Sequence, residues 1–257
     1  MRNKVFDSFE EAIADIPDGA SICMEAWGVA AVPNNLIAAL RKTGVKDLTV
    51  ITACFVPQVM PEQAFNFPTV LLPQMKKLIA GVVGIQRLGA GAFVKEYVEK
   101  GLEVELTSHG MLATRLYAGA VGLGGIYEPV GLGTILEEGK EKRVIDGQEY
   151  IFQKPIRADY AFINAYRADK LGNLVYRGVY RGNQPAMAMA SKVTIVEVEN
   201  EIVEPGGIDP EQVVTPGIFV DRIVKVPEDG LGTLQKQKET IYMIGEIEDA
   251  RKLMFRR

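Results

Sequence analysis

The chain has 257 residues, of which 47% are hydrophobic and 24% are charged. This composition supplies enough apolar surface for one large α/β domain or two smaller ones, and it excludes an intrinsically disordered protein. The formal net charge is −4, so the surface as a whole does not attract nucleic acid or an anionic membrane. We therefore expect no nucleic-acid or membrane partner, and a polyanionic ligand has to be held by local hydrogen-bond donors.

The N-terminal residues have a basic start, MRNK, but no apolar run follows it. This pattern predicts neither a secretion signal nor a membrane anchor. The two cysteines, Cys23 and Cys54, lie in apolar, strand-like stretches, where cysteine usually acts as a small buried hydrophobic residue. A reducing, cytoplasmic location follows as the expectation.

Helical and extended patterns alternate along the chain, which predicts an open, mainly parallel sheet with helices on both faces. The first helix is expected over Ser8–Ile16, with Asp7 or Ser8 as its cap. The next helix begins near Pro33, whose missing N–H needs no partner in a first turn, and ends at Gly44. The other elements predicted before residue 107 are strands at Ala20–Met24, Leu48–Thr52, Lys77–Val83 and Val104–Leu106 and a helix at Phe93–Lys100.

After residue 107 the only histidine, His109, falls between a strand and a helix predicted over Met111–Ala118. Such junctions commonly hold active sites in α/β proteins. Glycine and charge dominate residues 119–147, which predicts an irregular excursion over one edge of the sheet. We expect a single domain over residues 1–257, with a C-terminal helical extension from about Leu231. The remaining predicted elements are strands at Tyr160–Asn164, Val193–Glu199 and Phe219–Val226 and a short helix at Pro185–Lys192.

The turn from Glu25 to Pro33 is the first candidate site. It joins a predicted strand to a predicted helix and contains Trp27 and Gly28. Backbone amides exposed at such a turn can hold a carboxylate, a thioester oxygen or a phosphate. An ordinary strand-to-helix turn explains the same residues, so the pattern alone leaves both interpretations open.

His109 and the glycine-rich segment Gly122–Gly133 are further candidates. A single imidazole without partners in sequence indicates neither a metal site nor a catalytic triad, so a structural role is open as well. The string GLGG is too short to indicate a dinucleotide site, and loop flexibility is its alternative. Cys54 has no basic neighbour in sequence, which favours buried packing over a nucleophilic role.

One nearly continuous block, from Leu102 to Val224, carries an order of motifs that generic folding does not require. It reads LEVELTSHGML, GLGGIYEPVGLGT, EEGKE, IDGQEY, ADYAFINAYRADKLGNLVYRG, RGNQP, ASKVTIVEVE and TPGIFVDRIV. This order resembles the alpha, or A, subunit of the family I coenzyme A transferases, of the 3-oxoacid and acetate:acyl-CoA type. The resemblance extends upstream and covers most of the chain from Asp18 to Val226.

The resemblance implies the alpha subunit of a heteromeric CoA transferase, which moves CoA between an acyl-CoA and a small carboxylic acid. In that family a glutamate of the beta subunit, within a Glu-Asn-Gly segment, attacks the acyl-CoA, and this tripeptide does not occur here. We therefore expect a beta-subunit partner in an α2β2 assembly, coenzyme A as substrate, and no metal or redox cofactor. Segments resembling family loops at the subunit boundary contain Lys140, Arg177, Arg181 and Asn183.

The resemblance makes His109 the candidate catalytic residue. The transferases usually have glutamine at this place, which holds the acyl group, and the ring-cleaving acyl-CoA hydrolases of steroid breakdown have a catalytic acid. Imidazole can donate a hydrogen bond or accept a proton, so an acyl-CoA hydrolase or C–C hydrolase on the same two-subunit frame is the alternative function. A non-catalytic CoA-ester or sugar-phosphate binding protein is a third. The candidate substrate-binding residues are Glu25, Trp27, Gly28, Ala53, Cys54, Gly124, Gly125, Tyr127 and Glu128.

Several of these residues depart from the family pattern. Glu25 and Trp27 replace residues of a glycine-rich turn. Ala53 and Cys54 stand where the transferases usually have an asparagine pair that supports the oxyanion. Glu128 stands where threonine is common, and its carboxylate disfavours a negatively charged acyl tail unless a cation such as Arg115 neutralises it.

Overall fold

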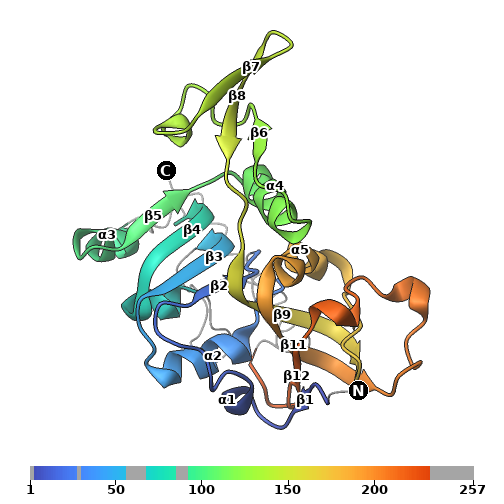
Figure 1. Ribbon diagram of the computed structural model, residues 1–257. Helices are drawn as coiled ribbons and strands as arrows, with labels where there is room; N and C mark the ends of the chain where they lie inside the picture. The colour runs from blue at the N-terminus through green and yellow to red at the C-terminus, as the bar shows by residue number, and fades with distance from the viewer. Residues whose placement is uncertain (1–2, 28–29, 56–67, 85–91, 232–257) are drawn as a thin grey trace, which may run out of the picture.

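The computed structural model describes residues 3–27, 30–55, 68–84 and 92–231. In this part of the chain, the strands of the main sheet follow the order β1-β12-β11-β9-β2-β3-β4-β5, and all neighbours in that order are parallel. The open, mainly parallel sheet predicted from the sequence is confirmed (Figure 1). The strands are β1 (Val5–Phe6), β2 (Ser21–Met24), β3 (Leu48–Phe55), β4 (Met75–Val83), β5 (Glu103–Leu106), β9 (Ala158–Asp169), β11 (Ser191–Val203) and β12 (Arg222–Lys225), and β10 (Leu174–Val175) pairs antiparallel with β9.

Helices cover both faces of this sheet, as predicted. Alternate residues of a strand point to opposite faces, so neighbouring residues of β3 enter different buried clusters: Val50 packs in one and Ile51 in the other. The first cluster contains residues of α1 (Phe9–Ala12), α2 (Asn34–Thr43) and α3 (Ala92–Glu99), and the second contains residues of α4 (His109–Ala120) and α5 (Gln184–Met189).

Local sequence sets the bounds of α2. Pro33 precedes its first turn, and Gly44 ends it in the left-handed conformation, at φ 72°, which glycine adopts without a steric penalty. Its apolar side chains Leu36, Ile37 and Leu40 are fully buried. Both predicted ends of this helix are therefore confirmed.

The first helix begins where predicted but ends early. The Ser8 hydroxyl accepts a hydrogen bond from the Glu11 amide at 3.1 Å, as an N-cap does. The helix ends at Ala12 rather than Ile16, because Ile13 already leaves the helical conformation at φ −113°. Pro17 also disfavours helical backbone in the residue before it.

Residues 119–147 are more regular than the sequence analysis predicted. They contribute β6 (Ile126–Glu128) and β7 (Lys142–Ile145), which pair antiparallel with β8 (Gln148–Gln153) in a small sheet that projects from the main body (Figure 1). Asp146 and Gly147 join β7 to β8 with φ 51° and 79°, the conformation of a two-residue hairpin loop. The predicted irregular loop is therefore wrong. That prediction relied on the glycine and charge content of the segment and overlooked the Asp-Gly pair, which is typical of a hairpin turn.

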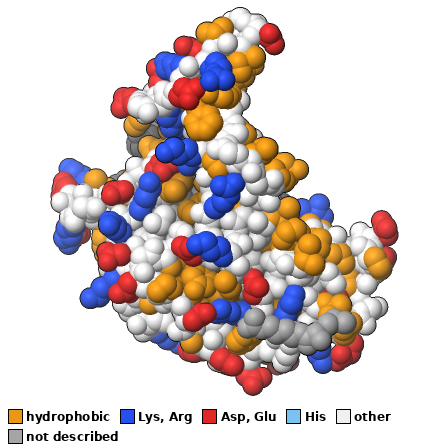
Figure 2. Space-filling view, in the orientation of Figure 1, with side chains coloured by type: hydrophobic (Ala, Val, Ile, Leu, Met, Phe, Trp, Pro, Cys, Tyr) orange, Lys and Arg blue, Asp and Glu red, His pale blue; other side chains and the backbone are white. Residues whose placement is uncertain are grey.

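Other bounds differ modestly. The strands β9 and β11 run beyond the predicted ranges, and β12 starts at Arg222 because a 3-10 turn, Gly217–Phe219, precedes it. The predicted helical extension after Leu231 lies outside the described residues. No helix in the described ranges is long and apolar enough to cross a membrane. Acidic and basic side chains are interspersed on the face shown in Figure 2, without a large region of one sign.

Candidate active site

Three predicted segments meet at the carboxyl edge of the main sheet. Glu25 directly follows β2, Ala53 and Cys54 lie near the end of β3, and His109 follows β5. The carboxyl ends of parallel strands share one edge, and the Cys54 amide donates a hydrogen bond to the Ala26 carbonyl at 3.1 Å. We call Glu25, Trp27, Ala53, Cys54 and His109 the edge site. Gly28 lies outside the described residues.

His109 is the first residue of α4. The Ser108 hydroxyl caps this helix by accepting a hydrogen bond from the Met111 amide at 3.0 Å. The imidazole packs edge-on against Trp27 with ring centroids 4.7 Å apart, and Trp27 is 51% exposed. Among the described residues, the buried Nδ1 atom of His109 has no hydrogen-bond partner. Close packing, rather than hydrogen bonding, therefore sets the position of the ring.

Gly81 in β4 provides the space for this imidazole. A Cβ atom at residue 81 would lie 2.7 Å from Nδ1 of His109 and 2.9 Å from the carbonyl oxygen of Ala53, and non-bonded carbon atoms do not approach other heavy atoms so closely. The sequence analysis missed Gly81. An isolated glycine inside an apolar strand, here LIAGVVG, is nevertheless a signal that another group approaches the backbone.

Glu25 is 1% exposed and faces the turn before α5. Its carboxylate accepts hydrogen bonds from the Asn183 amide at 2.6 Å and from the Ala26 amide at 3.2 Å, and burial raises its pKa. Gly182 packs against it, since a Cβ at residue 182 would lie 2.6 Å from Oε2. The contact fixes the Gly182–Asn183 turn beside the edge site, a link that the sequence analysis did not predict.

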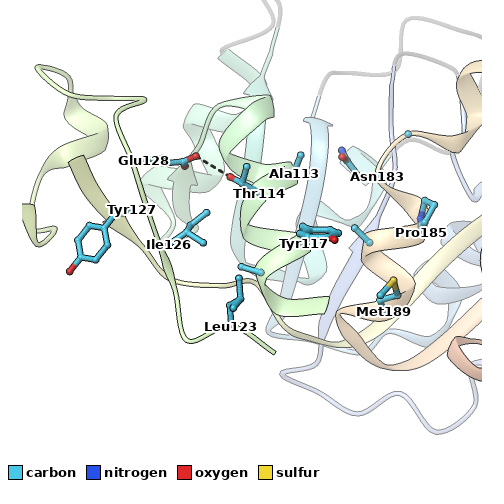
Figure 3. Close-up of a pocket in the computed structure, with 13 residues that line it drawn as sticks. Ala113, Thr114, Tyr117, Leu123, Ile126, Tyr127, Glu128, Asn183, Pro185 and Met189 are labelled. Atoms are coloured by element: carbon cyan, nitrogen blue, oxygen red, sulfur yellow. Dashed lines mark hydrogen bonds between the residues drawn. The ribbon is translucent and has the colours of Figure 1, made fainter. Parts of the chain in front are cut away.

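A cavity of about 660 Å³ opens beside the edge site, between α4, α5 and β6. His109, Ala113 and Tyr117 follow one another at intervals of four residues, so they share one face of α4, and this face borders the cavity. Asn183, whose amide binds Glu25, lies on the opposite wall. Figure 3 shows the side chains around the cavity, which include Thr114, Tyr117, Leu123, Ile126, Pro185 and Met189.

Of the candidate substrate-binding residues Gly124, Gly125, Tyr127 and Glu128, only the last two line this cavity. The Oε2 atom of Glu128 accepts a hydrogen bond from the Thr114 hydroxyl at 3.0 Å beside the cavity (Figure 3). The Tyr127 ring points away from the cavity in Figure 3, and its hydroxyl bonds to Glu141. Neither Gly124 nor Gly125 is among the described residues that line the cavity.

The buried Glu197 and the half-buried Glu199 lie on β11, and Glu197 contacts the start of α2. Glu197 accepts hydrogen bonds from the Asn35 and Leu36 amides at 2.9 and 3.1 Å. The Asn164 side chain donates to Glu197 and to Glu199, at 3.1 Å each. Burial raises the pKa of Glu197 to about 8 and that of Glu199 to about 7. The sequence analysis missed this cluster, because its members come from distant parts of the chain.

The two raised pKa values predict that stability falls with rising pH. Between roughly pH 4.5, where glutamate in an unfolded chain loses its proton, and pH 7 to 8, the folded state binds more protons than the unfolded state. The free energy of unfolding therefore decreases as the pH rises through this window. Glu199→Gln is expected to reduce the slope by roughly 1 kcal/mol per pH unit, measured by urea denaturation at pH 5, 6 and 7. Glu201→Gln, an exposed position on the same strand, is expected to leave the slope unchanged.

Across the described residues, no three His, Cys, Asp or Glu side chains come close enough to hold a metal ion together.

Comparison with solved structures identifies the fold. An acyl-CoA transferase from Escherichia coli O157:H7, in a thioester complex with CoA, superposes with a TM-score of 0.77 at 22% identity, over 91% of this chain and 49% of that chain. This chain thus spans about half of that enzyme's chain. The glutaconate CoA-transferase of Acidaminococcus fermentans superposes with a TM-score of 0.73 at 18% identity, over 95% of this chain and 88% of that chain.

Sequence comparison goes further. The A subunit of the 3-oxoadipate CoA-transferase of Pseudomonas putida is 36% identical over 237 residues, which are 92% of this chain and 99% of that protein. The A subunit of the probable succinyl-CoA:3-ketoacid coenzyme A transferase of Bacillus subtilis is 39% identical over 86% of this chain and 89% of that protein. The model of the Coenzyme A transferase family matches residues 6–226. The chain therefore belongs to the coenzyme A transferase family.

Proposed function

We propose that this chain is the alpha subunit of a two-subunit CoA transferase that moves CoA between an acyl-CoA and a small carboxylic acid. The observation that carries the proposal is the match to the corresponding subunits of known transferases over nearly their whole length. The other subunit supplies the attacking glutamate, since the expected Glu-Asn-Gly segment does not occur in this chain. The hydrolase alternative is not favoured, because these relatives are named transferases.

The proposed transfer needs no oxidant or reductant, and overall it neither consumes nor releases a proton. The partner's glutamate carboxylate attacks the thioester carbonyl carbon, the C–S bond breaks, and CoA leaves as a thiolate, which yields an acyl-glutamyl anhydride. The thiolate then attacks the glutamyl carbonyl, so the first carboxylate departs and a glutamyl-CoA thioester remains. The carboxylate of the acceptor acid then attacks the glutamyl-CoA thioester and releases the CoA thiolate. The thiolate attacks the acyl carbonyl of the resulting anhydride, which frees the glutamate and yields the new acyl-CoA.

The edge site supplies donors for this chemistry. Each attack places negative charge on a carbonyl oxygen, which preorganised donors stabilise. The first turn of α4, which starts at His109, presents backbone amides without intrahelical partners. Since Ala53 and Cys54 replace the expected asparagines, we assign the missing donor to Nε2–H of His109. The proposal includes an α2β2 assembly, a cytoplasmic location and coenzyme A as substrate without a metal or redox cofactor.

Reconstitution tests the proposed function. The chain is co-expressed with a candidate beta subunit of the same family, and the purified complex receives acetyl-CoA and a panel of carboxylic acids. New acyl-CoA products are expected, together with a CoA adduct on a glutamate of the partner, detected by mass spectrometry. The proposal fails if a stable complex exchanges no short-chain acyl group, or if this chain alone turns over thioesters at an undiminished rate.

Substitution of His109 separates a hydrogen-bond donor from a general base. His109→Gln keeps a donor, so the complex is expected to retain transfer within about tenfold, whereas His109→Ala is expected to lose roughly a hundredfold to a thousandfold in kcat. Exchange and thioester hydrolysis are measured in the same samples. If His109→Gln removes all turnover, the residue takes part in proton transfer and the hydrolase alternative gains support.

A further inference from the structure

The cavity beside the edge site offers a large, mainly apolar space near the proposed chemistry. It adjoins the face of α4 that begins with His109, and the Asn183 turn connects its opposite wall to Glu25. Its volume of about 660 Å³ is within the range of small-molecule sites. A group attached to a carbonyl carbon at the edge site can extend directly into it.

The wall of this cavity is mainly apolar. The side chains that face it include Tyr117, Leu123, Ile126 and Met189 (Figure 3). Hydrophobic side chains gather on the side of the molecule where α4 and α5 lie, as Figure 2 shows. Among the described residues that line it, Glu128 is the one carboxylic acid, and none is a lysine, an arginine or a histidine.

The nearby cations are engaged elsewhere. Arg115 lies on α4 but pairs with Glu105 at 2.8 Å and donates to the Lys154 carbonyl at 2.9 Å. The Lys140 amine donates to the neutral Gln153 side chain at 2.9 Å, and it interacts electrostatically with Glu128 without forming a direct ion pair. Both cations line a different cavity, of about 580 Å³. A carboxylate in the apolar cavity would therefore lose its water without gaining a positive partner.

Glu128 adds a second obstacle to an anionic substrate. One of its oxygens accepts the Thr114 hydrogen bond, and the other, Oε1, is buried with no hydrogen-bond partner among the described residues. This carboxylate has no direct ion pair in the described structure. A second carboxylate nearby would be repelled by this like charge.

Building on the proposed transferase function, we infer that the preferred acyl group is the neutral, apolar chain of a monocarboxylic acid, and that Glu128 excludes dicarboxylic acids. The chain of the acyl group packs between Tyr117, Ile126 and Met189. This specificity differs from the substrates in the names of the relatives, 3-oxoadipate and succinyl-CoA, which carry a second carboxylate.

Competition between acceptors tests the inference on the reconstituted complex. With acetyl-CoA as donor, kcat/KM is measured for hexanoate, succinate and 3-oxoadipate. Hexanoate is expected to exceed both dicarboxylates at least tenfold. Glu128→Lys supplies the missing cation and is expected to reduce this preference at least tenfold, chiefly by improving succinate, and Glu128→Gln is expected to act in the same direction to a smaller extent.

Two further variants locate the effect in the cavity. Tyr117→Ala removes an exposed side chain that lines the cavity, so it is expected to raise KM for hexanoate about tenfold and to raise KM for the much shorter acetate by a smaller factor. Glu149→Lys makes the same charge change at an exposed position of the small sheet and is expected to leave the acceptor preference unchanged.

The outcomes separate the two proposals. Faster transfer to succinate than to hexanoate in the wild-type complex overturns the inference and leaves the transferase function intact. An unchanged preference in both Glu128 variants refutes the role of that residue. Absence of exchange with every acid rejects the transferase function and, with it, the inference.

Discussion

Replacing Gly81 with alanine is expected to lower kcat of the assembled transferase by roughly a hundredfold, the usual effect of losing one oxyanion donor. The added methyl group would lie 2.7 Å from Nδ1 of His109 and 2.9 Å from the Ala53 oxygen. The Ala53 oxygen belongs to the neighbouring strand β3, so the imidazole is the group with room to move. Steady-state kinetics on the complex give kcat, and urea denaturation is expected to show an overpacking cost of about 1–3 kcal/mol.

Gly110→Ala is the matched control for this prediction. A Cβ atom at residue 110, one residue after His109, would meet only the Ser108 hydroxyl oxygen, at 4.0 Å. Alanine also favours a helix over glycine by up to about 1 kcal/mol. We expect unchanged kcat and equal or higher stability for this variant. Full activity in Gly81→Ala would show that the position of the imidazole does not matter for catalysis.

Glu197→Ala is expected to have the largest effect on stability, with a loss of roughly 3 kcal/mol or more in the free energy of unfolding at pH 7, because each buried donor left unsatisfied costs about 1–3 kcal/mol. The change leaves the amides of Asn35 and Leu36 and the side chain of Asn164 without this acceptor. Glu197 is 1% exposed, so water does not readily replace the lost carboxylate. Chemical denaturation of the isolated chain measures the difference.

Glu201→Ala provides the comparison on the same strand. Glu201 forms an ion pair with Arg167 at 2.7 Å, but its side chain is 48% exposed, and exposed pairs contribute at most about 1 kcal/mol. Its removal is expected to cost no more than that. Equal losses in the two variants would contradict the special role of the buried acceptor.

The predictable parts of the fold are those governed by short-range rules. Pro33 and Gly44 marked the ends of α2 because one fits a first turn and the other adopts a left-handed conformation. Apolar runs located the parallel strands other than β1, which the sequence analysis missed, although β9 extends to Asp169, five residues past the predicted end. Pairing with β11 on one side supports this extension, and such pairing is not encoded in the strand alone.

The candidate site was less predictable than the fold, because contacts between distant residues form it. The junction at His109 was predictable from a strand followed by a helix, and the transferase motifs supplied the remaining candidates. The contact of Gly81 with the imidazole joins residues 28 positions apart, and that of Glu25 with Asn183 joins residues 158 positions apart. Contacts of this kind depend on the register of the sheet, which a single sequence does not specify. The predicted roles of the other edge-site residues stay predictions.

The Asn35 side chain binds the backbone of Leu231, the last residue that the structure describes. Its Oδ1 accepts from the Leu231 amide at 2.9 Å, and its Nδ2 donates to the Leu231 carbonyl at 3.0 Å, as a neighbouring strand would do. The backbone amide of the same residue binds Glu197. The residue that binds the end of the described chain therefore also binds an ionisable group in the interior. If detaching Leu231 changes the proton affinity of Glu197, protonation of Glu197 must change the strength of the Leu231 contact to the same extent.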